Sequence, residues 1–301
     1  MRMKRTIVCA IVTVFAWTSC RNNTQPTEKD SQPKPEAMNT LDFKRGYSDV
    51  NGLRMYYEIY GQGKPLVLIH GGGSTIQSNF EEVIPLFAKS RQVVAMELQA
   101  HGRTNDRNKD LSFEQDADDI ATLLKNLNID KADFFGFSNG GTTTLQIAIR
   151  YPEMVNKIIL GSALAKRSGV PEWFWGFMEQ ATLDNMPEQL KTAYKQVAPD
   201  TSGLQTMHDR DANRMVNFKD IPDELIKSIQ APALIIIGDK DVITPEHAIE
   251  LSRQLPHADL AILPGGHGAY IGEVTTLTTH FKAAELATLP LIKSFLDKEE
   301  K

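Results

Sequence analysis

The ten residues DFFGFSNGGT, from 133 to 142, place a serine between glycines at the point where an apolar run ends. Gly136, Ser138 and Gly140 fit the pattern G-x-S-x-G, and the segment TTTLQIAIRYPE that follows is compatible with a helix. On a sharp turn from a strand to a helix, the hydroxyl of such a serine is exposed at the carboxyl end of the strand. Glycines are expected at the other two positions because a Cβ there would collide with the neighbouring backbone. The pattern therefore indicates that Ser138 is a nucleophile on a strained turn.

A serine hydroxyl is a weak nucleophile, so it needs a general base, and the base needs an acid that orients it. Downstream of Ser138, the segment IIIGDKDVITP carries Asp239 and Asp241 after an apolar run, and AILPGGHG carries His267 after the next run. Parallel strands bring their carboxyl ends to one edge of a sheet, so the three segments can meet there. We assign His267 as the base and Asp241 as the orienting acid, with Asp239 as the alternative acid.

Four other histidines follow Ser138 and are alternatives for the base. His208 lies in a region without strand signals, and His247 lies inside a helical segment. His257 lies at a helix end, and His280 lies near the C-terminal helix. Of the candidates, His267 is the one that lies in a glycine-rich loop directly after an apolar run. The assignment of the base to His267 follows from that position.

The segment LVLIHGGGST ends another apolar run with His70 and three glycines. Glycine lets backbone N–H groups face a ligand without a side chain in the way, and H-G-G-G loops of esterases use it for this purpose. We predict that the amide of Gly72 stabilises the oxyanion of the reaction, with Asn139 supplying the second donor. A phosphate-binding loop is excluded because the pattern G-x-x-x-x-G-K-[ST] does not occur.

The chain around these motifs alternates between strand and helix signals. Segments 43–50 and 53–61 flank Asn51-Gly52, a dipeptide typical of a tight hairpin. The second segment alternates Met55, Tyr57 and Ile59 against Arg54, Tyr56 and Glu58, so one of its faces is expected to be buried. Six short apolar runs then suit parallel strands covered on both faces: LVLIH (66–70), VVAMEL (93–98), DFFGF (133–137), KIILGSA (157–163), ALIIIG (233–238) and ADLAIL (258–263).

Helical patterns separate these runs. Segment 112–128 begins with a predicted capping box of Ser112 and Gln115 and carries one apolar stripe. Its acids are expected to form a solvated face: Asp116, Asp118 and Asp119. A second helix is expected to begin with Thr244 as its N-cap and Pro245 as its first residue. A hairpin followed by alternating strands and helices predicts an α/β protein with a mostly parallel sheet and helices on both faces.

One region, from about 165 to 220, has no strand run and is rich in aromatic residues and methionine. It follows the run KIILGSA, so we expect it to form a helical cap over one edge of the sheet. Its segment PEWFWGFMEQ is dense in large apolar side chains: Trp173, Phe174, Trp175, Phe177 and Met178. These side chains can line a pocket for an acyl group or ring, or they can dock the cap on the core, and both interpretations stay open.

In their order and spacing, these motifs resemble those of the α/β-hydrolase-fold serine hydrolases, from about residue 41 to residue 297. The segment ELQAHGRT (97–104) is similar to the D-x-R-G-H-G-x-S segment of that family, with Glu97, Gln99 and Ala100 in place of Asp, Arg and Gly. By the same resemblance, His101 has a structural role.

The resemblance implies a hydrolase that cleaves a small carboxylic ester, lactone or thioester through an acyl-enzyme intermediate, so the expected partner is a small acyl substrate. Relatives that act on alkyl halides or epoxides carry Asp at the position of Ser138, which disfavours those reactions. Two alternatives stay open: a C–C bond hydrolase with the same triad, and a catalytically silent binding module on the hydrolase scaffold. We expect no cofactor and no catalytic metal, because no H-E-x-x-H motif occurs.

The first twenty residues have a different composition, with the basic head MRMKR, the apolar run TIVCAIVTVFAW and the ending TSC. This composition is typical of a secretory signal, and the run is too short to span a bilayer, although an uncleaved anchor is an alternative. The ending resembles a bacterial lipoprotein signal, in which Cys20 would be lipidated, except that Trp17 stands where an aliphatic residue is usual.

The sequence therefore predicts a signal peptide at 1–19, a polar tether without regular structure at 20–40, and a hydrolase domain at 41–301. We expect an exported protein, anchored to a bacterial membrane through a lipid on Cys20 and facing the periplasm or the exterior. The formal charge of −5 and the lack of a Lys/Arg stripe give no reason to expect a nucleic-acid partner.

Overall fold

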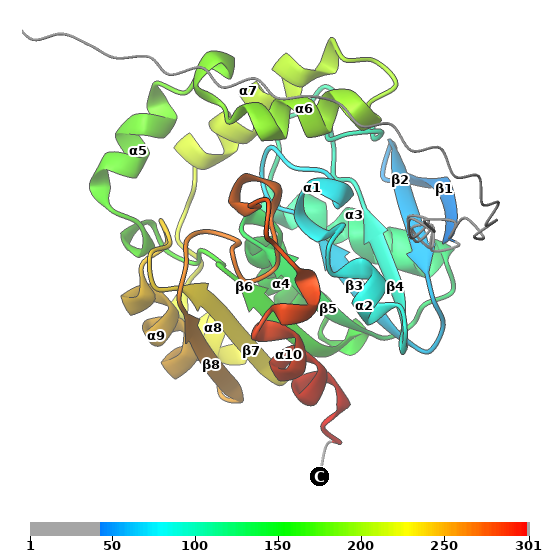
Figure 1. Cartoon of the computed structure of the whole chain (residues 1–301), viewed down its shortest axis with the longest axis vertical. Helices are drawn as coiled ribbons and strands as arrows, with labels where there is room; N and C mark the ends of the chain where they lie inside the picture. Colours follow the sequence, from blue (N-terminus) through cyan, green and yellow to red (C-terminus); the bar gives the residue numbers. More distant parts are fainter. Residues whose placement is uncertain (1–42, 300–301) are drawn as a thin grey trace, which may run out of the picture. The chain divides into compact units, whose positions relative to one another are not determined.

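The computed structural model describes residues 43–299, so the predicted signal peptide and tether, with Cys20, lie outside the described residues. Eight strands form one sheet in the order β1-β2-β4-β3-β5-β6-β7-β8 (Figure 1). They are β1 (Phe43–Val50), β2 (Leu53–Tyr60), β3 (Lys64–Ile69), β4 (Arg91–Met96), β5 (Ala132–Phe137), β6 (Val155–Gly161), β7 (Ala233–Gly238) and β8 (Ala258–Leu263). β2 pairs antiparallel with β1 and β4, and every other pair in this sheet is parallel, as predicted.

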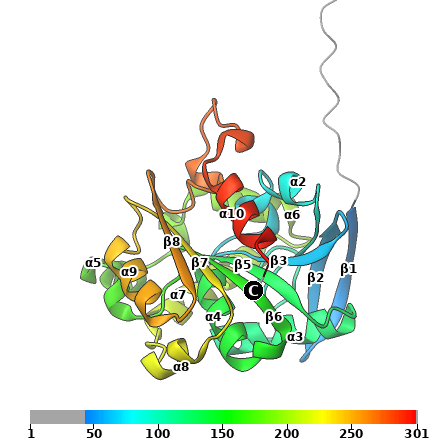
Figure 2. The ribbon, with the colours of Figure 1, turned by 90° about the horizontal axis from the view of Figure 1, so that it is seen from below.

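Helices cover both faces of the sheet, as Figure 2 shows. One face carries α3 (Phe113–Asn126), α4 (Asn139–Arg150), α8 (Asp223–Ser228) and α9 (Pro245–Gln254). The other face carries α1 (Ile76–Phe80), α2 (Ile84–Phe87) and α10 (Thr288–Asp297). The described residues also form five short 3-10 helices: η1 (Pro152–Met154), η2 (Arg167–Gly169), η3 (Leu183–Asn185), η4 (Val274–Thr276) and η5 (Ala283–Glu285).

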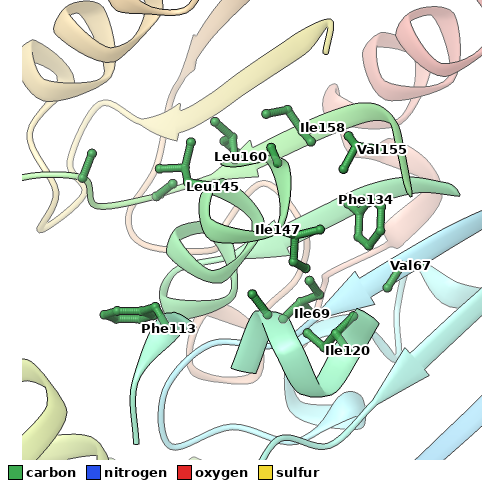
Figure 3. Close-up of a cluster of buried hydrophobic side chains, with 14 of the residues drawn as sticks. Val67, Ile69, Phe113, Ile120, Phe134, Leu145, Ile147, Val155, Ile158 and Leu160 are labelled. Carbon is green, nitrogen blue, oxygen red and sulfur yellow. The ribbon is translucent and has the colours of Figure 1, made fainter. Parts of the chain in front are cut away.

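The core is divided by the sheet because successive residues of a strand point to opposite faces. Val67 and Ile69 pack toward α3 and α4, whereas Leu66 and Leu68 pack toward α1, α2 and α10. Figure 3 shows the first of these clusters, in which Leu145 and Ile147 of α4 lie close to strand residues such as Ile158 and Leu160. This double-sided burial fixes the positions of the strand ends that carry the predicted site.

The predicted hairpin is confirmed at Asn51 and Gly52, which join β1 and β2 with φ values of 47° and 79°. The alternation along β2 does not produce a single buried face, however, because Met55 on one face and Tyr56 and Glu58 on the other are all almost fully buried. The Glu58 carboxylate accepts hydrogen bonds from the hydroxyls of Tyr56, at 2.7 Å, and Tyr60. Burial of this acid is possible because its partners are also on β2, two residues away on either side.

Helix α3 begins after Ser112, whose side chain accepts a hydrogen bond from the Gln115 amide at 3.1 Å. The predicted capping box is only half present, because the Gln115 side chain donates to Asp119 at 2.9 Å. The other predicted cap is confirmed, with Thr244 as the N-cap of α9 and Pro245 as its first residue.

The solvated acidic face predicted for α3 is wrong. Asp116 and Asp119 are 2% and 0% exposed, and Arg214 and Arg107, respectively, pair with them. Of the three acids, Asp118 is the one that remains partly exposed, and it pairs with Arg150. The spacing along α3 could not reveal this burial, because both guanidinium groups come from outside the helix, Arg107 from the loop before it and Arg214 from 98 residues away.

The edge strand β8 also departs from its predicted double-sided burial, with Ile262 41% exposed. It has a single neighbouring strand, β7, so less of its surface is covered. The region between β6 and α8 is helical, as expected, and contains α5 (Glu172–Glu179), α6 (Glu188–Val197) and α7 (Gly203–Val216). These cap helices lie together in the upper part of Figure 1.

Within residues 43–299, no helix combines the length and apolar character needed to cross a membrane.

Candidate active site

Ser138 lies on a tight turn between β5 and α4, with a φ of 55°. This left-handed backbone is strained for a residue with a side chain. A Cβ on Gly136 would lie 2.0 Å from the carbonyl oxygen of Gly140, and one on Gly140 would lie 2.1 Å from the carbonyl oxygen of Ile69. The predicted need for glycine at both positions is therefore confirmed.

The structure brings together the three side chains that sequence spacing had predicted to meet. The Nε2 atom of His267 is 3.0 Å from the Ser138 hydroxyl, and its Nδ1 atom is 2.8 Å from the carboxylate of Asp241. These residues follow β8, β5 and β7, respectively, so the site lies at the carboxyl ends of parallel strands. A carboxylate on one ring nitrogen leaves the other nitrogen available to take a proton from the hydroxyl.

The two candidate acids have different partners. Asp239 accepts a hydrogen bond from the Gly265 amide at 2.8 Å and so stabilises the loop that carries His267. Asp241 contacts the ring itself, and its other oxygen accepts a hydrogen bond from the Ser162 hydroxyl at 2.6 Å. Burial raises the pKa of Asp241, but the His267 ring and the hydrogen bonds hold that pKa below its ordinary value. Asp241 is thus ionised where it touches the imidazole.

The glycine loop after β3 lies beside the serine, since a Cβ on Gly71 would be 3.0 Å from the Cβ of Ser138. The Gly71 amide donates to the Asn79 side chain at 2.7 Å. Within residues 43–299, the amides of Gly72 and Asn139 donate no hydrogen bond to another group of the protein. Both predicted oxyanion donors are therefore next to the nucleophile and free to bind a ligand.

His70, at the start of this loop, is fully buried. Its Nε2 atom is 3.0 Å from the Leu98 amide, which can only donate, so the proton of the ring is on Nδ1 and is donated to the Gly71 carbonyl at 2.8 Å. Burial lowers the pKa of His70 to about 3, so the ring stays neutral. The histidine before the glycines therefore shapes the loop and lies away from the reacting groups.

The departure from the family pattern at Glu97 is accommodated by Arg103. The Glu97 carboxylate is buried and accepts hydrogen bonds from the Arg103 amide and from its guanidinium, at 2.5 and 2.6 Å. Burial raises the pKa of Glu97 to about 7, and Arg103 moderates that rise. The pair therefore joins the two ends of the loop 97–103, which follows strand β4.

A cavity of about 290 Å³ opens at Ser138 between the sheet and the cap. Phe174, Phe177 and Met178 of α5 line it. Trp175 instead docks the cap, because its ring packs on Phe218 and its Nε1 donates to a backbone carbonyl of the cap at 3.1 Å. Trp173 is 63% exposed. The two interpretations of the aromatic segment therefore hold for different residues.

Two polar residues of α7, His208 and Asp211, also line this cavity; His208 was an alternative base, and sequence reasoning assigned no role to Asp211. No motif surrounds Asp211, so no local signal could have identified it. Among the alternative bases, His247 is buried and its Nε2 accepts a hydrogen bond from the Ala165 amide at 3.0 Å. That contact makes His247 part of the packing between α9 and the cap.

Known proteins share this fold. The chain has the α/β-hydrolase fold, and residues 64–206 match the family model described as alpha/beta hydrolase fold. Human serine hydrolase BPHL is 27% identical to the chain over 232 residues, which are 72% of this chain and 77% of that protein. The 2-hydroxymuconate semialdehyde hydrolase of Pseudomonas sp. strain CF600 is 38% identical over 117 residues, 37% of this chain and 41% of that one.

Solved structures agree with this fold. The 2-hydroxy-6-oxo-6-phenylhexa-2,4-dienoate hydrolase from Rhodococcus sp. strain RHA1 superposes with a TM-score of 0.70 at 22% identity, covering 86% of this chain and 100% of that one. The chain therefore has the α/β-hydrolase fold, and the proteins that it resembles include serine hydrolases and hydrolases of dienoate substrates.

Proposed function

We propose that this protein is a serine hydrolase that cleaves a small carboxylic ester, lactone or thioester through an acyl-enzyme. One observation carries the proposal: the hydrogen-bonded line from Ser138 through His267 to Asp241 ends beside the two free amides of Gly72 and Asn139. A nucleophile, a base, an orienting acid and an oxyanion site are the parts that acyl transfer needs.

In this mechanism the Ser138 oxygen attacks the acyl carbon while His267 Nε2 takes the hydroxyl proton. Asp241 stabilises the imidazolium, and the oxyanion accepts hydrogen bonds from the two free amides. The alcohol or thiol then leaves with the proton from His267, and an acyl-serine remains. Water attacks this ester, its proton passes to His267 and then to Ser138, and the carboxylic acid is released.

The lining of the cavity favours an uncharged substrate. Within residues 43–299 its walls include Asp211 but no lysine or arginine. Several relatives are named for hydrolysis of dienoic acids, which are anions at neutral pH. Such a substrate would enter this cavity without a lysine or arginine to pair with its carboxylate. This observation supports the ester, lactone or thioester over the C–C bond alternative.

The test is the substitution Ser138→Ala. We expect it to lower kcat for p-nitrophenyl acetate by at least about 10³-fold and to abolish labelling by a fluorophosphonate probe. Ser252→Ala is a suitable control, because the Ser252 hydroxyl bonds the Ile249 carbonyl within its own helix. Parental turnover in the Ser138 variant would overturn the mechanism. A parent that neither turns over esters nor takes the probe would point to the binding module, and preference for a dienol-keto acid would point to C–C cleavage.

A further inference from the structure

Side chains hold almost every peptide group of the oxyanion loop, the segment 70–75. The carbonyl of Gly71 accepts from His70, and its amide donates to Asn79 of α1. The Gly72 carbonyl accepts from the Ser74 hydroxyl at 3.2 Å. These partners belong to the loop itself or to the sheet domain, so they are present whatever the cap does.

The anchor of Gly73 is different because it comes from the cap. The Gly73 amide donates to the Asp211 carboxylate of α7 at 2.5 Å, across 138 residues of sequence. The Gly72 carbonyl and the Gly73 amide belong to one peptide plane, which Ser74 holds at one end and Asp211 at the other. This plane shares the Gly72 α-carbon with the plane that carries the free N–H of Gly72. Its orientation therefore limits where that N–H can point.

Asp211 is surrounded by cations that balance its charge. His101 Nε2 lies 2.8 Å from the carboxylate, and Arg214 binds the other carboxylate oxygen. His101 Nδ1 faces the Gln99 carbonyl at 2.8 Å, so that nitrogen carries a proton, and a proton on Nε2 as well makes the ring an imidazolium. Burial lowers the pKa of His101, but the charge of Asp211 and the hydrogen bonds to Asp211 and Gln99 together outweigh it and raise that pKa above its ordinary value.

The same cations determine the charge state of Asp211. Burial raises the pKa of Asp211, but His101 and Arg214 hold it well below its ordinary range. Arg214 is in turn paired with Asp116 of α3 at 2.7 Å. A carboxylate beside an oxyanion site would oppose the negative charge that develops there. Two neighbouring cations remove that conflict, so Asp211 can act as a strong acceptor for the Gly73 amide.

We infer that Asp211 is a positioning residue through which cap helix α7 fixes the oxyanion loop, so that the free amide of Gly72 stays aimed at the site beside Ser138. The inference deepens the proposed function and rests on it. The cap then does more than enclose the substrate, because its docking completes the preorganisation of the oxyanion donor. Asp211 itself need not touch the substrate.

The experiment compares Asp211→Ala with Arg210→Ala. Arg210 is the neighbouring residue of α7 and also joins the cap to the sheet domain, through Asp106 and Asp110 at 3.0 and 2.9 Å. No hydrogen bond or ion pair joins Arg210 to the described oxyanion loop. We expect Asp211→Ala to lower kcat for a short neutral ester by about 10- to 100-fold with little change in KM. We expect Arg210→Ala to retain the parental kcat.

Asp211→Asn keeps the volume of the side chain but offers one acceptor oxygen to three donors. We expect an intermediate loss of kcat, about 3- to 10-fold. If the alanine variant does not fold, the kcat of Asp211→Asn tests the inference in its place. Equal losses of kcat in the Arg210 and Asp211 variants would overturn the inference, because docking of the cap in general would then explain them. Parental kcat in a folded Asp211→Ala or in Asp211→Asn would overturn it as well.

A second readout does not depend on hydrolysis. Amide hydrogen exchange of the segment 71–75 should be faster in both Asp211 variants than in the parent, and unchanged in Arg210→Ala. Unchanged exchange in the Asp211 variants would overturn the anchor even if the parent cleaves esters. Faster exchange in a protein whose parent cleaves no ester would support the anchor and overturn the proposed function, so the two failures are distinguishable.

Discussion

The Asp241 carboxylate is held by a chain of hydroxyl groups that the sequence motifs do not include. Ser162, at the end of β6, donates to Asp241 at 2.6 Å, and the Tyr270 hydroxyl lies 2.7 Å from the Ser162 oxygen. Because Ser162 uses its only proton on the carboxylate, Tyr270 must donate to Ser162. The backbone of Ser162 has a φ of 48°, a conformation that is strained for a residue with a side chain.

Ser162→Ala should therefore lower kcat/KM and move the acidic limb of its pH profile to higher pH. Asp241 must be ionised to stabilise the imidazolium, and its pKa lies below the ordinary value partly because Ser162 donates to it. Loss of a donor to the charged form raises that pKa, so activity is lost sooner as the pH falls. The measurement is kcat/KM against pH, with Tyr270→Phe expected to shift the limb less. An unchanged limb in Ser162→Ala would show that this hydroxyl does not tune Asp241.

At the scale of single elements, the large apolar residues of α5 lie in different surroundings. Phe174, Phe177 and Met178 are spaced by three and four residues, share one face of the helix and line the cavity. Trp175 turns toward Phe218 and the body of the cap. A periodic apolar segment could be recognised from sequence, but which member faces a cavity depends on where the helix packs.

Phe177→Ala should weaken the use of longer acyl chains more than that of acetate. Phe177 lines the cavity and is partly exposed, so loss of its ring should cost about 1 kcal/mol of binding, or roughly fivefold in kcat/KM, for esters long enough to reach it. Trp173→Ala is the matched control, since Trp173 lies on the same helix and is outside the lining. A p-nitrophenyl ester chain-length series measures the effect. Equal responses of the two variants would contradict the assigned pocket wall.

For the whole molecule, we propose export and anchoring through a lipid on Cys20. The basic head, the short apolar run and the ending TSC support this proposal, and the only cysteines of the chain are Cys9 and Cys20. Cys20→Ser should remove the lipid and release the protein from membranes, whereas Cys9→Ser should leave the modification intact. Detergent-phase partitioning and mass spectrometry of the N-terminus measure both. An unmodified Met1 on a soluble cytosolic protein would refute the proposal.

The sequence alone determined the fold class, the hairpin, the strand runs and the positions of Ser138, Asp241 and His267. These features follow from local chemistry: apolar periodicity selects strands and helices, and glycine marks the places where a turn excludes a Cβ. Chain order then placed the three site residues at strand ends that a parallel sheet brings to one edge. The structure distinguishes Asp241 from Asp239, because Asp241 contacts the His267 ring whereas Asp239 accepts from the Gly265 amide.

The tertiary structure alone decided which charges are buried and which distant groups serve the site. Asp116 and Asp119 look like surface acids on their helix but lie against arginines from outside it, Arg214 98 residues away and Arg107 12 residues away. Asp211 carries no motif, yet it bonds a glycine amide 138 residues away. The physical reason is that an ionised side chain can be buried only where partners balance it, and those partners come from parts of the chain that no local pattern records.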